Sequence, residues 1–262
     1  MIHFVGAGPG AEDLITVRGK QLLEEADVII YAGSLVNPNL LKYADTECQI
    51  YNSAKMTLEE VLDVMQKTEE QGKTTVRLHT GDPCIYGAIR EQMDVLDEKN
   101  IAYDSCPGVS SFCGAAAALD LEYTLPEISQ SVVITRMEGR TPVPAKESIA
   151  SFAAHQATMV IFLSTGMLEE LSARLIEGGY TKDTPAAIVY KATWEDEKKF
   201  ICTVGTLAQT AKEHQITKTA LMIIGDVVHD AAYDRSKLYD PTFSTEYREA
   251  KKQGQAYENR NN

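Results

Sequence analysis

Residues 2–11 read IHFVGAGPGA, and this stretch sets the fold expected for the first half of the chain. Ile2–Gly6 is short and apolar, as in a strand buried on both faces, and the glycines after it let the backbone turn sharply. Further strands and helices are expected at Asp27–Ala32, Thr75–Thr80, Asp13–Ala26 and Thr57–Gln71. Strands alternating with helices over short connections predict a mostly parallel sheet with helices on its faces.

The second half of the chain has a different pattern. Strands are expected at Ser131–Arg136, Thr158–Ser164, Pro185–Ala192, Lys198–Val204 and Thr219–Gly225, and helices at Met167–Gly178 and Leu207–Glu213. The short acidic turn Thr193–Glu197 suits a hairpin, so this sheet is expected to be mixed. We therefore expect an α/β protein of two domains, residues 1–120 and 121–230, followed by a polar tail, residues 231–262.

Composition limits the classes of partner. The chain has 262 residues, of which 44% are hydrophobic and 24% charged, and a formal net charge of −13. This charge repels nucleic acid backbones and anionic membrane surfaces, so neither is expected as a partner. The apolar runs, such as Met159–Leu163, are too short to span a bilayer, and the N-terminus lacks a secretory pattern. A cytoplasmic protein is expected.

The cysteines and histidines do not have the spacing of a metal site. Cys48, Cys84, Cys106, Cys113 and Cys202 form no C-x-x-C pair, which is typical of reduced thiols and not of a disulfide framework. The histidines are also too far apart for a local ligand set, so no metal is expected. Cys84 is of interest because it lies inside a glycine-bearing motif.

The loop at residues 6–11, GAGPGA, matches the bare dinucleotide pattern G-x-G-x-x-[GA]. Two features argue against a dinucleotide. Pro9 removes an N–H where a pyrophosphate needs a donor, and the second strand ends at Ala32, where that pattern requires an acid. A ligand site and a simple tight turn both stay open for this loop, with a nicotinamide-dependent oxidoreductase as the weaker functional alternative.

Two more glycine-bearing stretches follow this loop along the chain, and the earlier of them comes directly after the expected strand Thr75–Thr80. His79–Gly87 reads HTGDPCIYG, and Cys106–Ser111 reads CPGVSS and leads into a small-residue helix, Ser110–Leu119. Ligands of open α/β sheets gather beyond the carboxyl ends of strands, so the first two loops are expected to face one another across a cleft. The alternatives are an Asp-Pro turn in the second stretch and helix capping by a serine in the third.

In order, these segments resemble the tetrapyrrole methylases, a family of S-adenosylmethionine-dependent methyltransferases with two α/β domains. The match runs from Met1 to about Asp230. Within the family the chain is most similar to the (cobalt-)precorrin-4 methyltransferases, which methylate carbon 11 of the ring in cobalamin biosynthesis. This similarity is carried by YAGSLV (31–36), NSAKM (52–56), RLHTGDP (77–83), PGVSSF (107–112), PEISQ (126–130), GRTP (139–142), ATWEDE (192–197) and SKLYDP (236–241).

The resemblance implies that S-adenosylmethionine binds in the cleft between the domains. The residues implied to lie beside this cofactor are Pro9, Thr80, Gly81, Asp82, Ile85, Ser110, Ser111, Leu163, Ala192 and Ala220. It also implies a homodimer and an anionic tetrapyrrole as substrate. Because the protein is acidic, the carboxylates of that substrate need local cations. The candidates are Arg136 and Arg140, whose ordinary place would be solvated surface, and then Lys55 and His79.

The resemblance does not identify a catalytic base. Relatives that methylate uroporphyrinogen carry an aspartate after the second strand and a lysine further on, whereas this chain has Ala32 at the first position and no clear counterpart of the second. A sulfonium methyl is already electrophilic and the reduced ring is electron-rich, so alignment is the main requirement. The alternatives are another precorrin or uroporphyrinogen methyltransferase, an NAD(P)-dependent oxidoreductase and a non-catalytic tetrapyrrole carrier.

Overall fold

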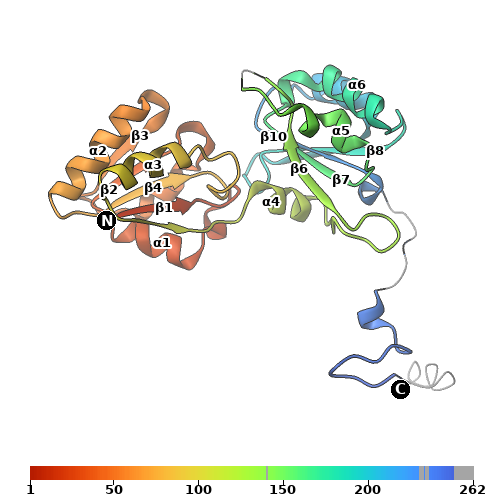
Figure 1. Ribbon diagram of the computed structural model, residues 1–262, viewed down its shortest axis with the longest axis horizontal. Coiled ribbons are helices and arrows are strands. Elements are labelled where there is room, and N and C mark those ends of the chain that lie inside the picture. Colours follow the sequence, from red (N-terminus) through yellow and green to blue (C-terminus); the bar gives the residue numbers. More distant parts are fainter. Residues whose placement is uncertain (140, 230–232, 234–235, 251–262) are drawn as a thin grey trace.

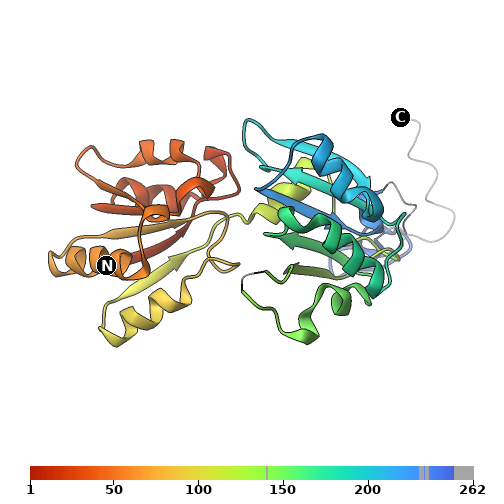
Figure 2. The same cartoon turned by 90° about the horizontal axis from the view of Figure 1, so that it is seen from above.

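The computed structural model describes residues 1–139, 141–229, 233 and 236–250. Two five-stranded sheets lie side by side along the longest axis of the molecule (Figure 1), and the view from above separates them equally clearly (Figure 2). The N-terminal sheet is formed by strands within residues 2–106 and the C-terminal sheet by strands within residues 132–224. The predicted α/β class, a parallel sheet followed by a mixed one, is confirmed.

The N-terminal sheet has the strand order β3-β2-β4-β1-β5, and every neighbouring pair is parallel. Its strands are β1 (Ile2–Gly6), β2 (Val28–Tyr31), β3 (Gln49–Asn52), β4 (Thr75–His79) and β5 (Tyr103–Cys106). The three inner strands are the ones that the sequence predicts. The two edge strands were missed because they are short and half exposed, and carry polar residues in place of a continuous apolar run.

Helices cover both faces of this sheet, with α1 on one side and α2 and α3 on the other (Figure 1). Their bounds are α1 (Val17–Glu24), α2 (Leu58–Glu70) and α3 (Arg90–Glu98). The start of α2 is set by a capping box, in which Thr57 Oγ1 accepts from the Glu60 N–H and Glu60 Oε2 accepts from the Thr57 N–H. The predicted first helix is shorter than expected, and α3 was not predicted.

The C-terminal sheet has the order β6-β7-β10-β8-β9. Its strands are β6 (Val132–Arg136), β7 (Thr158–Phe162), β8 (Pro185–Tyr190), β9 (Lys198–Thr203) and β10 (Ala220–Ile224). Only β6 and β7 pair in parallel, and the remaining pairs are antiparallel. The hairpin predicted across the acidic turn is the β8–β9 pair.

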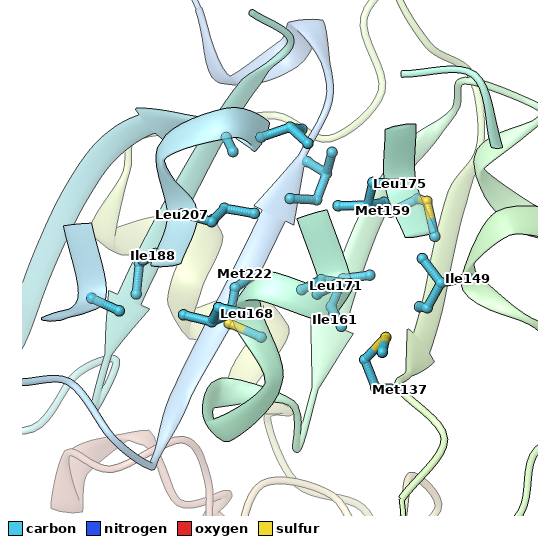
Figure 3. Packing of buried hydrophobic residues seen from close by; sticks show 14 of the residues in the cluster. Met137, Ile149, Met159, Ile161, Leu168, Leu171, Leu175, Ile188, Leu207 and Met222 are labelled. Carbon is cyan, nitrogen blue, oxygen red and sulfur yellow. The ribbon is translucent and has the colours of Figure 1, made fainter. Parts of the chain in front are cut away.

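The core of this half lies between the C-terminal sheet and three helices, α5 (Ile149–Ala153), α6 (Leu168–Gly178) and α7 (Leu207–Glu213). Leu168, Leu171 and Leu175 project from one face of α6 onto Met159 and Met222 of the sheet (Figure 3). The opposite face of the sheet is covered by α4 (Ser111–Ala118), the small-residue helix. Because α4 follows β5 directly, it joins the N-terminal strands to the core of the C-terminal half.

Short 3-10 turns and a tail complete the chain. The turns are Glu12–Leu14, Gly33–Leu35, Pro38–Tyr43, Ser53–Lys55, Ala145–Glu147, Thr165–Met167, Val204–Thr206, Asp226–Val228 and Lys237–Tyr239. Of the predicted polar tail, residues 233 and 236–250 are described, and residues 236–250 extend away from both sheets (Figure 1). Within the described ranges, every helix is too short or too polar to cross a bilayer.

Candidate active site

Three loops meet at the carboxyl edge of the N-terminal sheet, because β4, β1 and β5 are neighbours and run in parallel. The first and second loops form a two-residue bridge, in which the Gly8 N–H donates to Gly81 O at 3.2 Å and the Gly81 N–H donates to Gly8 O at 2.8 Å. The Ala7 N–H donates to His79 O at 2.7 Å and extends the contact. The two loops therefore face one another, as the sequence predicts.

Glycine is required where the third loop joins this contact. A Cβ atom on Gly108 would lie 2.2 Å from Gly81 O, and one on Gly6 would lie 2.6 Å from Gly108 Cα. Both distances are far below an ordinary carbon contact, so no side chain fits at either position without moving backbone. The three loops pack as a single unit for this steric reason.

Asp82 holds the second loop to the third. Its Oδ2 accepts from the Gly108 N–H and its Oδ1 from the Cys84 N–H, each at 2.8 Å. Partial burial acts to raise the pKa of this carboxyl, but hydrogen bonds from the side chain and backbone of Cys84 and from the Gly108 backbone outweigh it and lower the pKa. The hydrogen bond to Asp82, with some burial, raises the pKa of the exposed Cys84 thiol, which does not favour a nucleophilic thiolate.

The C-terminal half contacts the first loop through the acidic turn after β8. The Trp194 indole donates from Nε1 to Pro9 O at 3.2 Å, and the Ala11 N–H donates to Thr193 Oγ1 at 3.0 Å. A Cβ atom on Gly10 would lie 2.1 Å from Trp194 Cδ1, so the indole packs directly on the loop backbone. These contacts fix the two halves against one another at one end of the site.

The same contacts leave the first loop few donors for a pyrophosphate. The Gly8 N–H is bonded to the second loop, Pro9 has none, and the Ala11 N–H is bonded to Thr193. The loop also does not open a helix, since α1 begins at Val17 after the N-cap Thr16. A dinucleotide site of the usual kind places the pyrophosphate at a helix N-terminus, so this geometry argues against a nicotinamide cofactor.

Every residue that the sequence predicts beside the cofactor lines one cavity between the two halves. From the N-terminal half come Pro9, Thr80, Gly81, Asp82, Ile85, Ser110 and Ser111, and from the C-terminal half Leu163, Ala192 and Ala220. These residues, which the family resemblance implies, are up to about two hundred positions apart in the sequence and lie around one cavity, and the contact of each with a cofactor stays a prediction.

Ser110 decides between the two interpretations of the third motif. It occupies the N-cap position of α4, but its side chain accepts no hydrogen bond from the helix. The residue is buried, with 7% of its surface exposed, and it lines the cavity. Capping therefore does not explain this serine, and its hydroxyl is available to a ligand.

The cavity wall contributed by the C-terminal half is strained. Leu163, Lys191, Thr193 and Thr219 follow or precede strands of that sheet and have φ values of 53°, 46°, 68° and 57°. Non-glycine residues adopt this left-handed region at a cost, and they persist in it where the surrounding structure fixes them. Leu163, Lys191 and Thr219 line the cavity, and Thr193 lies between two residues that do.

Several cavity residues were not predicted. Trp194 and Lys191 line the wall, where the Lys191 ammonium is paired with Asp196 at 2.6 Å. Tyr86 of the second loop lies against Phe162 at the end of β7, with ring centroids 5.6 Å apart, and so bridges the two halves. The signal for Trp194 was present, because a lone tryptophan in an acidic turn has an apolar ring with no evident place in a core.

A second cavity lies within the N-terminal half and shares the residues Leu35, Thr80, Ile85 and Tyr86 with the first. Its other lining residues come from the end of β4, the 3-10 turn at Ser53–Lys55, α2 and α3. The shared residues show that the two cavities adjoin. One cavity lies between the halves and the other extends over the N-terminal sheet.

The predicted substrate-binding cations are placed differently from one another. The Arg136 guanidinium donates at 3.1 Å to the carbonyls of Met137, Thr141 and Pro142, so it is held to its own loop. Lys55 is exposed and lines neither cavity, and Arg140 lies outside the described residues. His79 lines the second cavity, but burial and the charge of Arg77 lower its pKa to about 3, so it is a neutral hydrogen-bonding group and not a cation.

Comparison with known proteins agrees with this geometry. The family model of tetrapyrrole (corrin/porphyrin) methylases matches residues 1–208. A cobalt-precorrin-4 C(11)-methyltransferase of Methanocaldococcus jannaschii is 55% identical over 96% of this chain and 97% of its own length. A precorrin-4 C(11)-methyltransferase of Sinorhizobium sp is 41% identical over 94% of this chain and 98% of its own length.

Solved structures give the same result. The X-ray structure of a cobalt precorrin-4 methyltransferase, a cobalamin biosynthetic enzyme, is 42% identical, with a TM-score of 0.85 over 87% of this chain and 95% of its own. Uroporphyrin-III C-methyl transferase from Thermus thermophilus, complexed with S-adenyl homocysteine, has the same fold at 24% identity, with a TM-score of 0.74 over 87% of this chain and 98% of its own. The chain therefore belongs to the tetrapyrrole (corrin/porphyrin) methylases.

Proposed function

We propose that this protein is an S-adenosylmethionine-dependent methyltransferase that methylates carbon 11 of precorrin-4, in its cobalt-bearing form, in cobalamin biosynthesis. The structural observation that carries the proposal is the single cavity between the halves, which is lined by all of the residues predicted beside the cofactor. Relatives of full length, at 55% and 41% identity, have the C(11)-methyltransferase activity in their names. The higher identity belongs to the relative named for cobalt-precorrin-4.

The residues of the cavity fit such a cofactor better than they fit a dinucleotide. Pro9, Ile85 and Leu163 provide apolar walls, and the Ser110 hydroxyl is a polar group that the helix does not use. The N–H groups of Ala7, Gly8 and Ala11 in the first loop are used by protein contacts, which suits a ligand without a pyrophosphate. When bound, S-adenosylmethionine would supply an electrophilic methyl group on a sulfonium sulfur.

The protein's own contribution is position and exclusion of water. The three packed loops and the left-handed residues of the wall hold the cavity in a fixed shape. A fixed shape orients the reacting groups, and such orientation can lower a reaction barrier by up to roughly 7–11 kcal/mol. Tyr86 lines both cavities, and its ring contacts Phe162 of the other half. No acid–base residue is needed for transfer itself, in keeping with Ala32 at the end of β2.

The direct test is mass spectrometry of cobalt-precorrin-4 after incubation with enzyme and S-adenosylmethionine. We expect one added methyl group, located at carbon 11 by NMR, and a slower reaction with the metal-free precorrin-4. Methylation of neither substrate would contradict the proposal. Preferred turnover of uroporphyrinogen would assign the chain to another reaction of the family.

We also propose a homodimer in the cytoplasm. Support for the dimer comes from the tail, where Leu238, Tyr239 and Tyr247 are 65%, 70% and 95% exposed on a segment that extends away from the sheets. An extended segment that exposes three apolar side chains could bury them against a second copy of the chain. Light scattering should give twice the chain mass for the full chain and the single mass after truncation at His229. An unchanged mass after truncation would exclude the tail as the contact.

A further inference from the structure

A polar stripe runs along one face of the central strand β4. Thr75, Arg77 and His79 alternate with Val76 and Leu78, and the two apolar residues belong to the cluster on the α1 side of the sheet. The three polar residues therefore face α2 and α3. All three are buried, with 0%, 6% and 4% of their surface exposed. Polar residues in such a place are costly unless they have a partner or a function.

Arg77 is held rigidly but its charge is not neutralised. Its Nε donates to Gln92 Oε1 at 3.2 Å and its Nη1 to the carbonyl of Ile30 at 3.1 Å, while Gln92 Nε2 donates to Ala88 O. Burial lowers the pKa of Arg77 to about 10, so the guanidinium is charged at neutral pH. Among the described residues no carboxylate pairs with it. Its Nη2 has no hydrogen bond to them either.

His79 lies two residues along the same face and also lacks a partner. Its Nε2 is buried and makes no hydrogen bond to the described residues. Arg77 and His79 both line the second cavity, together with the hydroxyl-bearing residues Ser53, Thr57 and Thr80. A fixed cation and a residue with an unsatisfied ring nitrogen therefore line the same cavity, which adjoins the predicted cofactor site.

We propose that Arg77 and His79 form a buried carboxylate-binding subsite that takes one peripheral carboxylate of the tetrapyrrole. The proposal rests on the proposed function for the substrate class and assigns Arg77, in place of Arg136 and Arg140, as the main counter-charge. The free Nη2 of Arg77 is one donor, the neutral His79 ring is a second donor in the tautomer with its proton on Nε2, and a carboxylate offers two acceptors. Glu91 also lines this cavity, so a second acidic group near its side chain is disfavoured and the subsite selects a single carboxylate.

The test uses uroporphyrin III, a stable octacarboxylate that is not a methyl acceptor, and calorimetry on the full chain. We expect Arg77→Met to weaken uroporphyrin binding by about 10- to 100-fold, as for the loss of a charge-assisted hydrogen bond, with S-adenosylhomocysteine affinity within about twofold. Arg77→Lys should recover part of the loss. Arg18→Met, which removes an exposed arginine of α1, should leave both affinities unchanged. Gln92→Met removes the hydrogen bond from Arg77 Nε but keeps the charge of Arg77. It should therefore weaken uroporphyrin binding less than Arg77→Met does.

A second measurement separates binding from folding. The ring nitrogens of His79 should shift in ¹⁵N NMR when uroporphyrin binds to the wild-type protein, and should not shift with S-adenosylhomocysteine alone. Equal losses in Arg77→Met and Gln92→Met, or an unperturbed His79, would overturn the subsite. If Arg77→Met binds uroporphyrin as tightly as the wild type does, and the wild type methylates cobalt-precorrin-4, the subsite alone is refuted. Absence of both binding and turnover would refute the proposed function.

Discussion

Replacing Asp82 by Asn tests whether the three loops act as one unit. The carboxylate accepts two backbone N–H groups, one from its own loop and one from the loop after β5, both at 2.8 Å. An amide of the same size retains one oxygen acceptor but presents an NH2 group to the second N–H. The substitution therefore removes one charge-assisted hydrogen bond and sets two donors against each other.

The expected loss follows from these contacts. A hydrogen bond to a charged group contributes about 1.5–3 kcal/mol, and the half-buried position of Asp82 favours the lower end. At about 2–4 °C per kcal/mol, the midpoint of thermal unfolding should fall by roughly 3–12 °C. S-adenosylhomocysteine should bind about tenfold more weakly, because Asp82 and Gly81 line the predicted cofactor cavity.

The difference in stability between wild type and Asp82→Asn should depend on pH, and the sign follows from the pKa of Asp82. The pKa of Asp82 is lowered in the fold, so its carboxylate stabilises the protein above the unfolded value of about 3.9, and this stabilisation is lost as pH falls through the lower folded value. The gap between wild type and Asp82→Asn should therefore be constant from pH 8 to about pH 5 and close below about pH 4. Differential scanning fluorimetry across this range measures it.

The control is Asp13→Asn, which neutralises an exposed aspartate of the same half and should leave the midpoint unchanged. A midpoint for Asp82→Asn that equals that of the control at neutral pH would refute the reasoning. So would a gap that widens on acidification. Either result would mean that the loops are held by the glycine contacts alone.

Three further substitutions test other contacts. Gly108→Ala places a Cβ atom 2.2 Å from Gly81 O and should lower the free energy of unfolding in urea by roughly 1–3 kcal/mol or more, whereas Gly166→Ala, with open space around it, should not. Equal urea midpoints for the two variants would contradict the steric argument. Trp194→Phe removes a hydrogen bond between the halves and should cost about 0.5–1.5 kcal/mol, measured by calorimetry, and no loss would mean that packing of the ring suffices. Thr57→Ala removes the α2 cap and should cost about 1 kcal/mol by circular dichroism in urea, unless the helix starts elsewhere.

The fold could be predicted where apolar pattern and burial coincide. The inner strands β1, β2 and β4 are buried on both faces and appear as continuous apolar runs, with the polar stripe of β4 as the exception. The edge strand β5 has the sequence YDSC with two exposed residues, and propensity gives no strand there. Helix α3 was missed because it lacks a side-chain cap and begins within an irregular loop. Edge strands and uncapped helices depend on tertiary contacts, which the hydrophobic pattern of the sequence does not record.

The candidate site could be predicted as a group, and its polar details could not. Family resemblance gathered residues from Pro9 to Ala220 that line one cavity. Arg136 and Arg140 were predicted as the counter-charges, but the Arg136 guanidinium donates to carbonyls of its own loop and Arg140 lies outside the described residues. Arg77 was overlooked because a charge inside a strand pattern reads as an interruption of it. Arginine is rarely buried unless it has a partner. An arginine inside a predicted buried strand was therefore the signal that the sequence offered.

The left-handed residues around the cavity bear on how this enzyme can adapt to heat. Each such backbone costs on the order of 1–3 kcal/mol, and a glycine at Leu163, Lys191, Thr193 or Thr219 would release most of it. Selection for heat resistance alone would therefore favour glycine at these positions, where it would also make the backbone of the cavity wall more flexible. Under the proposed function, heat resistance favours glycine at these four positions, whereas turnover favours the residues present.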